Sequence, residues 1–138
     1  MLKNINPLLG PELLFTLRSM GHGDEIAIVD GNYPANTDAK ELIRADGHGA
    51  NAMLDAILSV IPLDEMVEAS VFMPDTPQDQ PIHQKFRQTV QKHEPKSKFQ
   101  LLKGAAFYDR VKGCFAIVAT SETALYGNIV LRKGVIHL

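Results

Sequence analysis

The chain has 138 residues, 45% of them hydrophobic and 22% charged, which is the composition of one compact globular domain and excludes a disordered or fibrous protein. Fourteen Lys and Arg against sixteen Asp and Glu give a net charge of -2, so the chain lacks the strongly basic character of domains that bind nucleic acid. Its longest apolar run, Cys114 to Ala119, is far shorter than the about 20 residues that cross a membrane, so we expect no membrane association.

The first predicted elements are a helix and a strand joined by a glycine-rich turn. Apolar residues recur at helical spacing over Pro11–Met20, which predicts a helix that begins with proline at its first position. Gly21 is typical of the residue just past a helix. Apolar residues that first alternate and then run together over Glu25–Asp30 predict a strand that ends at Asp30.

The rest of the chain alternates between strands and helices. Clusters of turn-forming residues predict loops over Gly31–Asp38 and Pro74–Pro81. The other predicted elements are, in chain order, strand Glu41–Asp46, helix Ala52–Ile61, strand Glu68–Met73, helix Ile82–His93, strand Phe99–Leu102, helix Ala105–Lys112, and strands Cys114–Ala119 and Ile129–Arg132. This alternation predicts a single α/β domain over residues 1–138, with a mixed or parallel sheet covered by helices on both faces.

Two features bear on the cellular compartment. The first seven residues lack the apolar segment of a signal peptide, so we expect no export. The single cysteine, Cys114, lies in an apolar run, where a free cysteine is usually buried and inert. A chain without disulfides fits a reducing compartment, and we expect a cytoplasmic protein.

The segment Gly21-His22-Gly23-Asp24-Glu25 is the most informative local pattern. Two glycines leave little bulk around His22, so a ligand can approach, and an imidazole can give or take a proton near neutral pH. The alternative is a surface histidine in an ordinary turn, because glycines also end helices. His22 is therefore a candidate catalytic acid or base.

Asp30 and the pair Arg44 and Asp46 are candidates for binding a ligand. Asp30 closes an apolar strand and opens a glycine-rich loop, a position that faces ligands in α/β folds, although aspartate also begins ordinary turns. Arg44 and Asp46 stand two residues apart and hence on one side of a strand. A structural ion pair is the alternative interpretation of this second pattern.

Tyr126, Gly127 and Asn128 precede the last predicted strand. They offer a phenol, an open backbone and an amide, which suit hydroxyl groups better than anions, although a β-turn explains the same residues. Phe107 and Tyr108 begin a short helix, where one of the two rings is expected in the core and the Tyr108 hydroxyl is available to a site.

Histidine and cysteine spacing indicates no metal site. The five histidines form no H-x-x-x-H pair, and one cysteine cannot build a Cys-based zinc site. His83 and His93 lie in a polar helical stretch and are predicted to face solvent. Glycine patterns for nucleotides are absent too, so we expect no cofactor. The remaining histidine, aspartates and neutral polar groups suit proton transfer on an uncharged polyhydroxy ligand.

Several of these segments, in the same order, give the chain a family resemblance. The segments are Gly21-His22-Gly23-Asp24-Glu25-Ile26, Ile43-Arg44-Ala45-Asp46-Gly47, Phe107-Tyr108-x-Arg110, and Glu122 to Asn128 followed by Lys133-Gly134-Val135. With them the chain resembles the L-fucose mutarotase and D-ribose pyranase family from Pro7 to Val135. Gly23 and the Tyr126-Gly127-Asn128 segment are similar to the fucose branch.

The resemblance implies a function and an assembly. It implies that His22 is the catalytic acid or base, that Asp30 binds the sugar, and that Tyr126, Gly127 and Asn128 reach the sugar across a subunit boundary. It also implies a monosaccharide substrate and a ring-shaped homo-oligomer, typically a decamer, with no metal or cofactor.

One departure from the family pattern concerns the sugar. Fucose-type members usually carry an arginine where this chain has Gly104, and the neighbouring Lys103 offers a point charge in place of a planar fork. D-ribose pyranase-type activity and a non-catalytic sugar-binding or regulatory role in a sugar transport operon therefore remain alternatives. A further alternative is an aldose-ketose isomerase with Asp24 or Glu25 as the base.

Overall fold

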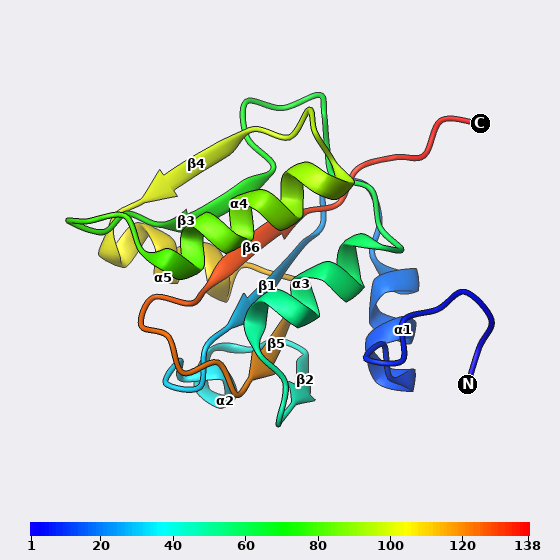
Figure 1. Ribbon diagram of the computed structural model, residues 1–138, viewed down its shortest axis with the longest axis horizontal. Helices are drawn as coiled ribbons and strands as arrows, with labels where there is room; N and C mark the ends of the chain where they lie inside the picture. Colours follow the sequence, from blue (N-terminus) through cyan, green and yellow to red (C-terminus); the bar gives the residue numbers. More distant parts are fainter.

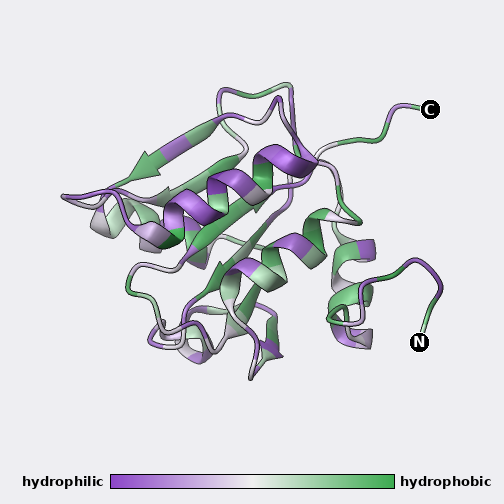
Figure 2. Cartoon of the chain, in the orientation of Figure 1, coloured by the Kyte–Doolittle hydropathy of each residue, from purple (hydrophilic) through white to green (hydrophobic).

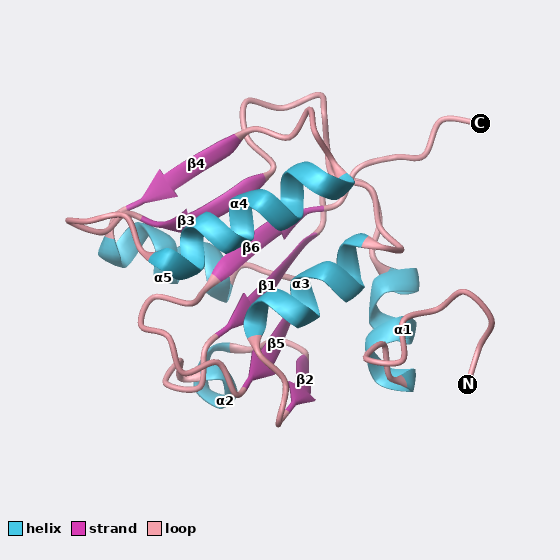
Figure 3. Ribbon diagram, in the orientation of Figure 1, coloured by secondary structure: helices cyan, strands magenta, loops and turns pink.

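Strands and helices alternate along the chain largely as the sequence patterns predict (Figure 3). The helices are α1 (Pro11–Ser19), α2 (Ala35–Asp38), α3 (Ala50–Leu58), α4 (Pro81–His93) and α5 (Gly104–Lys112). The strands are β1 (Glu25–Val29), β2 (Leu42–Ala45), β3 (Val71–Pro74), β4 (Phe99–Leu102), β5 (Ala116–Thr120) and β6 (Ile129–Arg132). The computed structural model describes residues 1–138, and its elements form one α/β domain (Figure 1).

The strands form one six-stranded sheet in the order β2-β5-β1-β6-β3-β4. Strand β6 runs antiparallel to its neighbours β1 and β3, whereas all other neighbouring strands are parallel. Residues Ile26 to Val29 of β1 are 0% exposed. A central strand that is covered on both faces needs apolar residues at every position, which explains the unbroken apolar run there.

Helices cover both faces of the sheet, as predicted (Figure 1). Residues of α1, α3 and α4 pack in one core cluster with Ile26 and Ile28, and residues of α2 and α5 pack in a second cluster with Ala27 and Val29. Successive side chains of β1 therefore point into opposite layers. Figure 2 shows the apolar central strands beneath the polar outer side of α4. None of the helices is long and apolar enough to cross a membrane.

The structure corrects several predicted boundaries. Residues 31–38 were expected to be a loop, but Ala35–Asp38 form α2, where Ala35 is buried and the Tyr33 hydroxyl donates to Asp38 Oδ2 at 2.8 Å. Packing therefore stabilises a turn too short to be helical by itself. Strand β3 begins at residue 71 rather than 68, and β5 begins at 116 rather than 114 because Cys114 closes the turn after α5.

The direction of the strands creates two distinct ends of the sheet. Strands β1 to β5 all run in one direction, so their last residues meet at one end, which we call the carboxyl end. The opposite end, where these strands begin and β6 finishes, is the amino end. His22 precedes β1 and therefore lies at the amino end, whereas Asp30 follows β1 at the carboxyl end.

Candidate functional site

Asp30 and Asn128 are joined at the carboxyl end of the sheet. The backbone N–H of Asp30 donates to Asn128 Oδ1 at 2.8 Å, and Asp30 Oδ1 accepts from the backbone N–H of Asn32 at 3.0 Å. Asp30 is 7% exposed and Asn128 is 8% exposed. Two candidates that stand 98 positions apart in the sequence therefore form one polar unit, at the strand ends where α/β folds bind ligands.

The turn that carries Asn128 is tightly packed. Tyr126 has a positive φ of 59°, and its carbonyl accepts from the backbone N–H of Asn128 at 2.8 Å. A Cβ atom at Gly127 would stand 2.8 Å from Glu122 Cγ and 3.0 Å from the Ala124 carbonyl oxygen, so only glycine fits without movement. Tyr126 itself is 48% exposed.

His83 supports this turn from α4. Its side chain is buried, and Nε2 lies 2.8 Å from the Tyr126 carbonyl oxygen, to which it donates. Burial lowers the pKa of His83, and the hydrogen bond to Tyr126 opposes that shift in part. The prediction that His83 faces solvent is therefore wrong. Its spacing from Phe86 and Val90, which are also buried in α4, was the signal that could have placed it on the inner face.

Glu122 connects three loops at the carboxyl end. Its carboxylate accepts from the backbone N–H of Ala50 at 3.1 Å, at the start of α3, and from that of Ala124 at 3.0 Å. Its backbone carbonyl accepts from the N–H of Gly31 at 2.9 Å. Sequence reasoning placed Glu122 in a motif without a role, because the groups that it binds lie far away along the chain.

Tyr108 lies beside the loop that follows Asp30. Its ring stacks on Tyr33, with centroids 5.3 Å apart, and the backbone N–H of Tyr33 donates to the Asp30 carbonyl at 3.3 Å. Phe107 is buried, so it is the core member of the aromatic pair, as expected for one of the two. Lys103 is exposed and directly follows β4 at the carboxyl end of the sheet. Strand β3 lies between β4 and β6, so Lys103 is on the edge strand and not next to the turn before β6.

His22 is placed at the amino end, away from these residues. Its side chain is 48% exposed, and Nε2 lies 3.1 Å from Oδ2 of Asp64, whose side chain is only 2% exposed. Asp64 Oδ2 also accepts from Arg132 Nε at 3.1 Å, and Oδ1 accepts from the backbone N–H of Met66 at 3.0 Å. Sequence reasoning missed Asp64, which follows Leu63 in a segment without a recognisable motif.

The other acidic residues near His22 have structural partners. The Asp24 carboxylate accepts from the backbone N–H of Gly21 at 2.8 Å and so fixes the turn. Arg110 donates to both carboxylate oxygens of Glu25, at 2.9 and 2.6 Å, and packs over the Phe72 ring. These bonds disfavour Asp24 or Glu25 as the free base of an aldose-ketose isomerase.

Arg44 and Asp46 form an exposed ion pair with each other. Arg44 donates from Nε and Nη2 to the two Asp46 oxygens at 3.0 and 2.9 Å. This is the structural alternative that the sequence left open. No group of three or more His, Cys, Asp or Glu side chains is arranged to hold a metal ion.

His22 and Asp30 cannot contact the same small ligand within one chain. The five residues of β1 separate them, and a strand advances about 3.3 Å per residue, so the first and last residues of β1 are about 13 Å apart. Asp30 and Asn128 therefore lie together at the carboxyl end, whereas His22 lies at the opposite end of the sheet.

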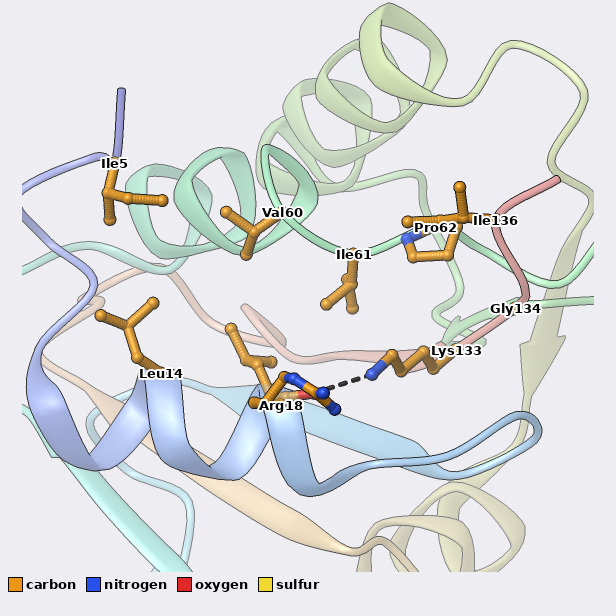
Figure 4. Close-up of a pocket in the computed structure, with 10 residues that line it drawn as sticks. Ile5, Leu14, Arg18, Val60, Ile61, Pro62, Lys133, Gly134 and Ile136 are labelled. Atoms are coloured by element: carbon orange, nitrogen blue, oxygen red, sulfur yellow. Dashed lines mark hydrogen bonds between the residues drawn. The ribbon is translucent and has the colours of Figure 1, made fainter. Parts of the chain in front are cut away.

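One apolar hollow of the molecule involves none of the predicted site residues. It has a volume of about 420 Å³ and lies between α1, the segment after α3 and the C-terminal segment (Figure 4). Lys133 reaches across it and donates to the carbonyls of Leu17 and Met20 at 2.8 and 2.6 Å, which caps the end of α1. Most of its lining residues are apolar, so it does not offer the polar groups that a sugar would need.

Comparisons with known proteins agree on one family. The sequence profile described as the RbsD / FucU transport protein family matches residues 3–136. The fucose mutarotase of Bos taurus is 42% identical over an alignment of 146 residues, gaps included. The alignment covers 98% of this chain and 94% of that protein.

Solved structures give the same result. The fucose mutarotase of Streptococcus pneumoniae, solved in complex with L-fucose, is 42% identical and superposes with a TM-score of 0.92, covering 99% of this chain and all (100%) of that chain. RbsD of Bacillus subtilis, solved in complex with D-ribose, shares the fold with a TM-score of 0.78 at 19% identity, covering 99% of this chain and 100% of that chain.

Proposed function

The chain belongs to the RbsD/FucU family, and we propose that it is a mutarotase that interconverts the α and β anomers of L-fucose. The observation that carries this proposal is the near full-length identity to fucose mutarotases, including one solved with L-fucose. The site chemistry supports it: His22 is a half-exposed imidazole backed by a buried carboxylate. Asp30, Tyr126, Gly127 and Asn128 supply the hydrogen-bonding groups that sugar hydroxyls need.

Mutarotation requires only proton transfers. The pyranose opens when its ring oxygen gains a proton and the anomeric hydroxyl loses one; the aldehyde carbon then rotates, and the ring closes on its other face. An imidazole can perform such transfers near neutral pH, and a positioned acid or base typically accelerates them about 10²–10⁴-fold. We propose His22 for this role, and we propose that Asp30 and Asn128 hold the sugar while it opens.

We further propose that each site is shared between two subunits of a ring-shaped homo-oligomer, with a decamer as the expected size. The separation of His22 from Asp30 along β1 supports this proposal, because a monosaccharide is too short to reach both within one chain. If the amino end of one copy faces the carboxyl end of the next, the contact joins two different surfaces. Contacts of this kind form rings when the rotation closes.

Position 104 bears on the choice of sugar. A Cβ atom at Gly104 would meet nothing within 4 Å, so the space that a longer side chain would occupy is open. Lys103 is exposed beside it and supplies a charge without the planar geometry of a guanidinium. We expect this difference to weaken the binding of L-fucose rather than to abolish the proton transfer.

We also propose that the protein acts in the cytoplasm, where the free thiol of Cys114 stays reduced.

The test is an exchange NMR measurement on the purified protein with L-fucose, D-ribose and D-galactose. We expect faster α/β exchange of L-fucose than in buffer alone, and a loss of about 10²-fold or more in His22→Ala. Sugar binding by calorimetry without faster exchange would instead support a non-catalytic binding protein. Faster exchange of D-ribose alone would support a pyranase, and a ketose signal would identify an isomerase.

A further inference from the structure

We infer that Lys133 is a positioning residue for the proton transfer: its ammonium group fixes the turn that carries His22. This inference rests on the proposed function and adds a residue to it. Lys133 directly follows β6, so it lies at the amino end of the sheet, as His22 does.

The backbone of His22 depends on its neighbours for its position. Neither its N–H nor its carbonyl makes a hydrogen bond. On one side of His22, the backbone N–H of Lys133 donates to the Asp24 carbonyl at 2.9 Å, and the Lys133 carbonyl accepts from the Gly23 N–H at 2.8 Å. These two bonds extend the antiparallel pairing of β1 and β6 and fix the residues that follow His22.

The side chain of Lys133 fixes the residues on the other side, at the end of α1. A glycine that ends a helix commonly adopts a positive φ, which lets nearby N–H groups bond the last carbonyls. Gly21 does not have a positive φ. Lys133 Nζ instead donates to the carbonyls of Leu17 and Met20, at 2.8 and 2.6 Å. The helix dipole also favours a cation at this end of α1.

The surroundings of the Lys133 ammonium group are electrostatically unfavourable. The hollow around it is lined mostly by apolar residues, and Arg18 is the only other charged residue in that lining (Figure 4). Burial and repulsion from Arg18 lower the pKa of Lys133, and attraction to Asp24 opposes this shift only in part. An apolar side chain of the same length would avoid this cost. The contribution of the charge is therefore its bonds to the end of α1.

Lys40 provides a matched control. Its Nζ donates to the Gly113 carbonyl at 3.3 Å, also at the amino end of the sheet. Gly113 belongs to the turn after α5 and not to the turn that carries His22. Loss of this bond should therefore leave the reaction unchanged.

The experiment measures kcat and KM for L-fucose by exchange NMR in Lys133→Met and Lys40→Met, with assembly checked by size exclusion. Methionine keeps the apolar stem in the hollow and removes the donors. We expect kcat of Lys133→Met to fall about 10- to 100-fold with KM changed by less than about 3-fold, because a displaced catalytic group slows the reaction while the carboxyl end still holds the sugar. Amide hydrogen exchange of residues 20–24 should become faster in the same variant. Lys40→Met should change none of these quantities.

Chemical rescue separates the ammonium group from the packing of the side chain. Lys133→Cys should be as slow as Lys133→Met. Alkylation of the introduced thiol with 2-bromoethylamine builds a lysine analogue and should restore most of the wild-type kcat. Alkylation with iodoethane adds a chain of similar length without the amine and should restore none. Cys114 is buried, so the introduced thiol is the reactive one in the native protein.

Two results would overturn the inference and leave the proposed function intact. One is full kcat of Lys133→Met beside inactive His22→Ala, with only the free energy of unfolding reduced, which is the result that a purely structural lysine would give. The other is the same kcat after both alkylations, and this comparison decides even if Lys133→Met fails to assemble. Unaccelerated exchange by the wild-type protein would refute the proposed function, and the inference with it.

Discussion

Replacement of His83 by leucine tests how the turn at the carboxyl end is held. The variant removes the donor to the Tyr126 carbonyl, which keeps its second bond from the Asn128 N–H. The loss of one hydrogen bond should lower the free energy of unfolding by about 0.5–1.5 kcal/mol at pH 7.5. Because Tyr126 has a positive φ of 59°, we also expect the turn to relax and the sugar to bind more weakly.

The same variant has a characteristic pH dependence. Burial lowers the pKa of His83, so in acid the unfolded chain binds a proton that the folded chain does not. The wild-type protein therefore loses stability as the pH falls below the value of about 6.5 for an unfolded histidine, by up to about 1.4 kcal/mol per pH unit. His83→Leu lacks this loss, so the stability gap between the two proteins should narrow between pH 7.5 and 5.5.

The assay is urea unfolding at both pH values and at one protein concentration, because assembly also changes the apparent stability. His48→Gln serves as the control, since His48 is exposed and its substitution should change the unfolding free energy by less than about 0.5 kcal/mol at either pH. A gap that stays constant or widens on acidification would refute the argument that His83 is buried in its neutral form.

Two further predictions concern packing and reactivity. Gly127→Ala brings its methyl group to 2.8 Å from Glu122 Cγ, so we expect about 1–3 kcal/mol of destabilisation by urea unfolding and weaker sugar binding by calorimetry. Gly10→Ala, where nothing lies within 4 Å, should change sugar binding little, and equal effects would contradict the packing argument. Burial raises the pKa of the Cys114 thiol to about 12, so native protein should resist alkylation at pH 8 while urea-unfolded protein reacts; rapid native labelling would contradict this.

The sequence predicts the elements whose pattern reflects burial along one segment. The helix near residues 11–19 and strand β1 follow from apolar spacing, because their buried positions repeat at a fixed period. Helix α2 escaped prediction because its turn-forming residues are held by distant packing rather than by local preference. The burial of His83 was not predicted, because α4 is mostly polar and only a narrow stripe of its surface is buried.

The candidate site was only partly accessible from the sequence. Asp30 and Asn128 could each be selected from their place at a strand end, but their bond joins positions 98 apart and requires the sheet order. No local sequence pattern selects Asp64, because its partners Arg132 and His22 lie on other segments of the chain. Long-range pairings of this kind depend on the three-dimensional fold rather than on residue spacing.

The shared site is the central claim of this account, and a mixed assembly tests it most directly. His22→Ala and Asp30→Asn should each be nearly inactive alone, because every site then lacks either the His22 imidazole or the Asp30 carboxylate. When the two variants are co-expressed in equal amounts and assemble at random, about one quarter of the sites should pair an intact His22 with an intact Asp30 from the neighbouring copy. Exchange NMR should then show about a quarter of the wild-type rate. A mixed assembly as inactive as either variant alone would contradict the account.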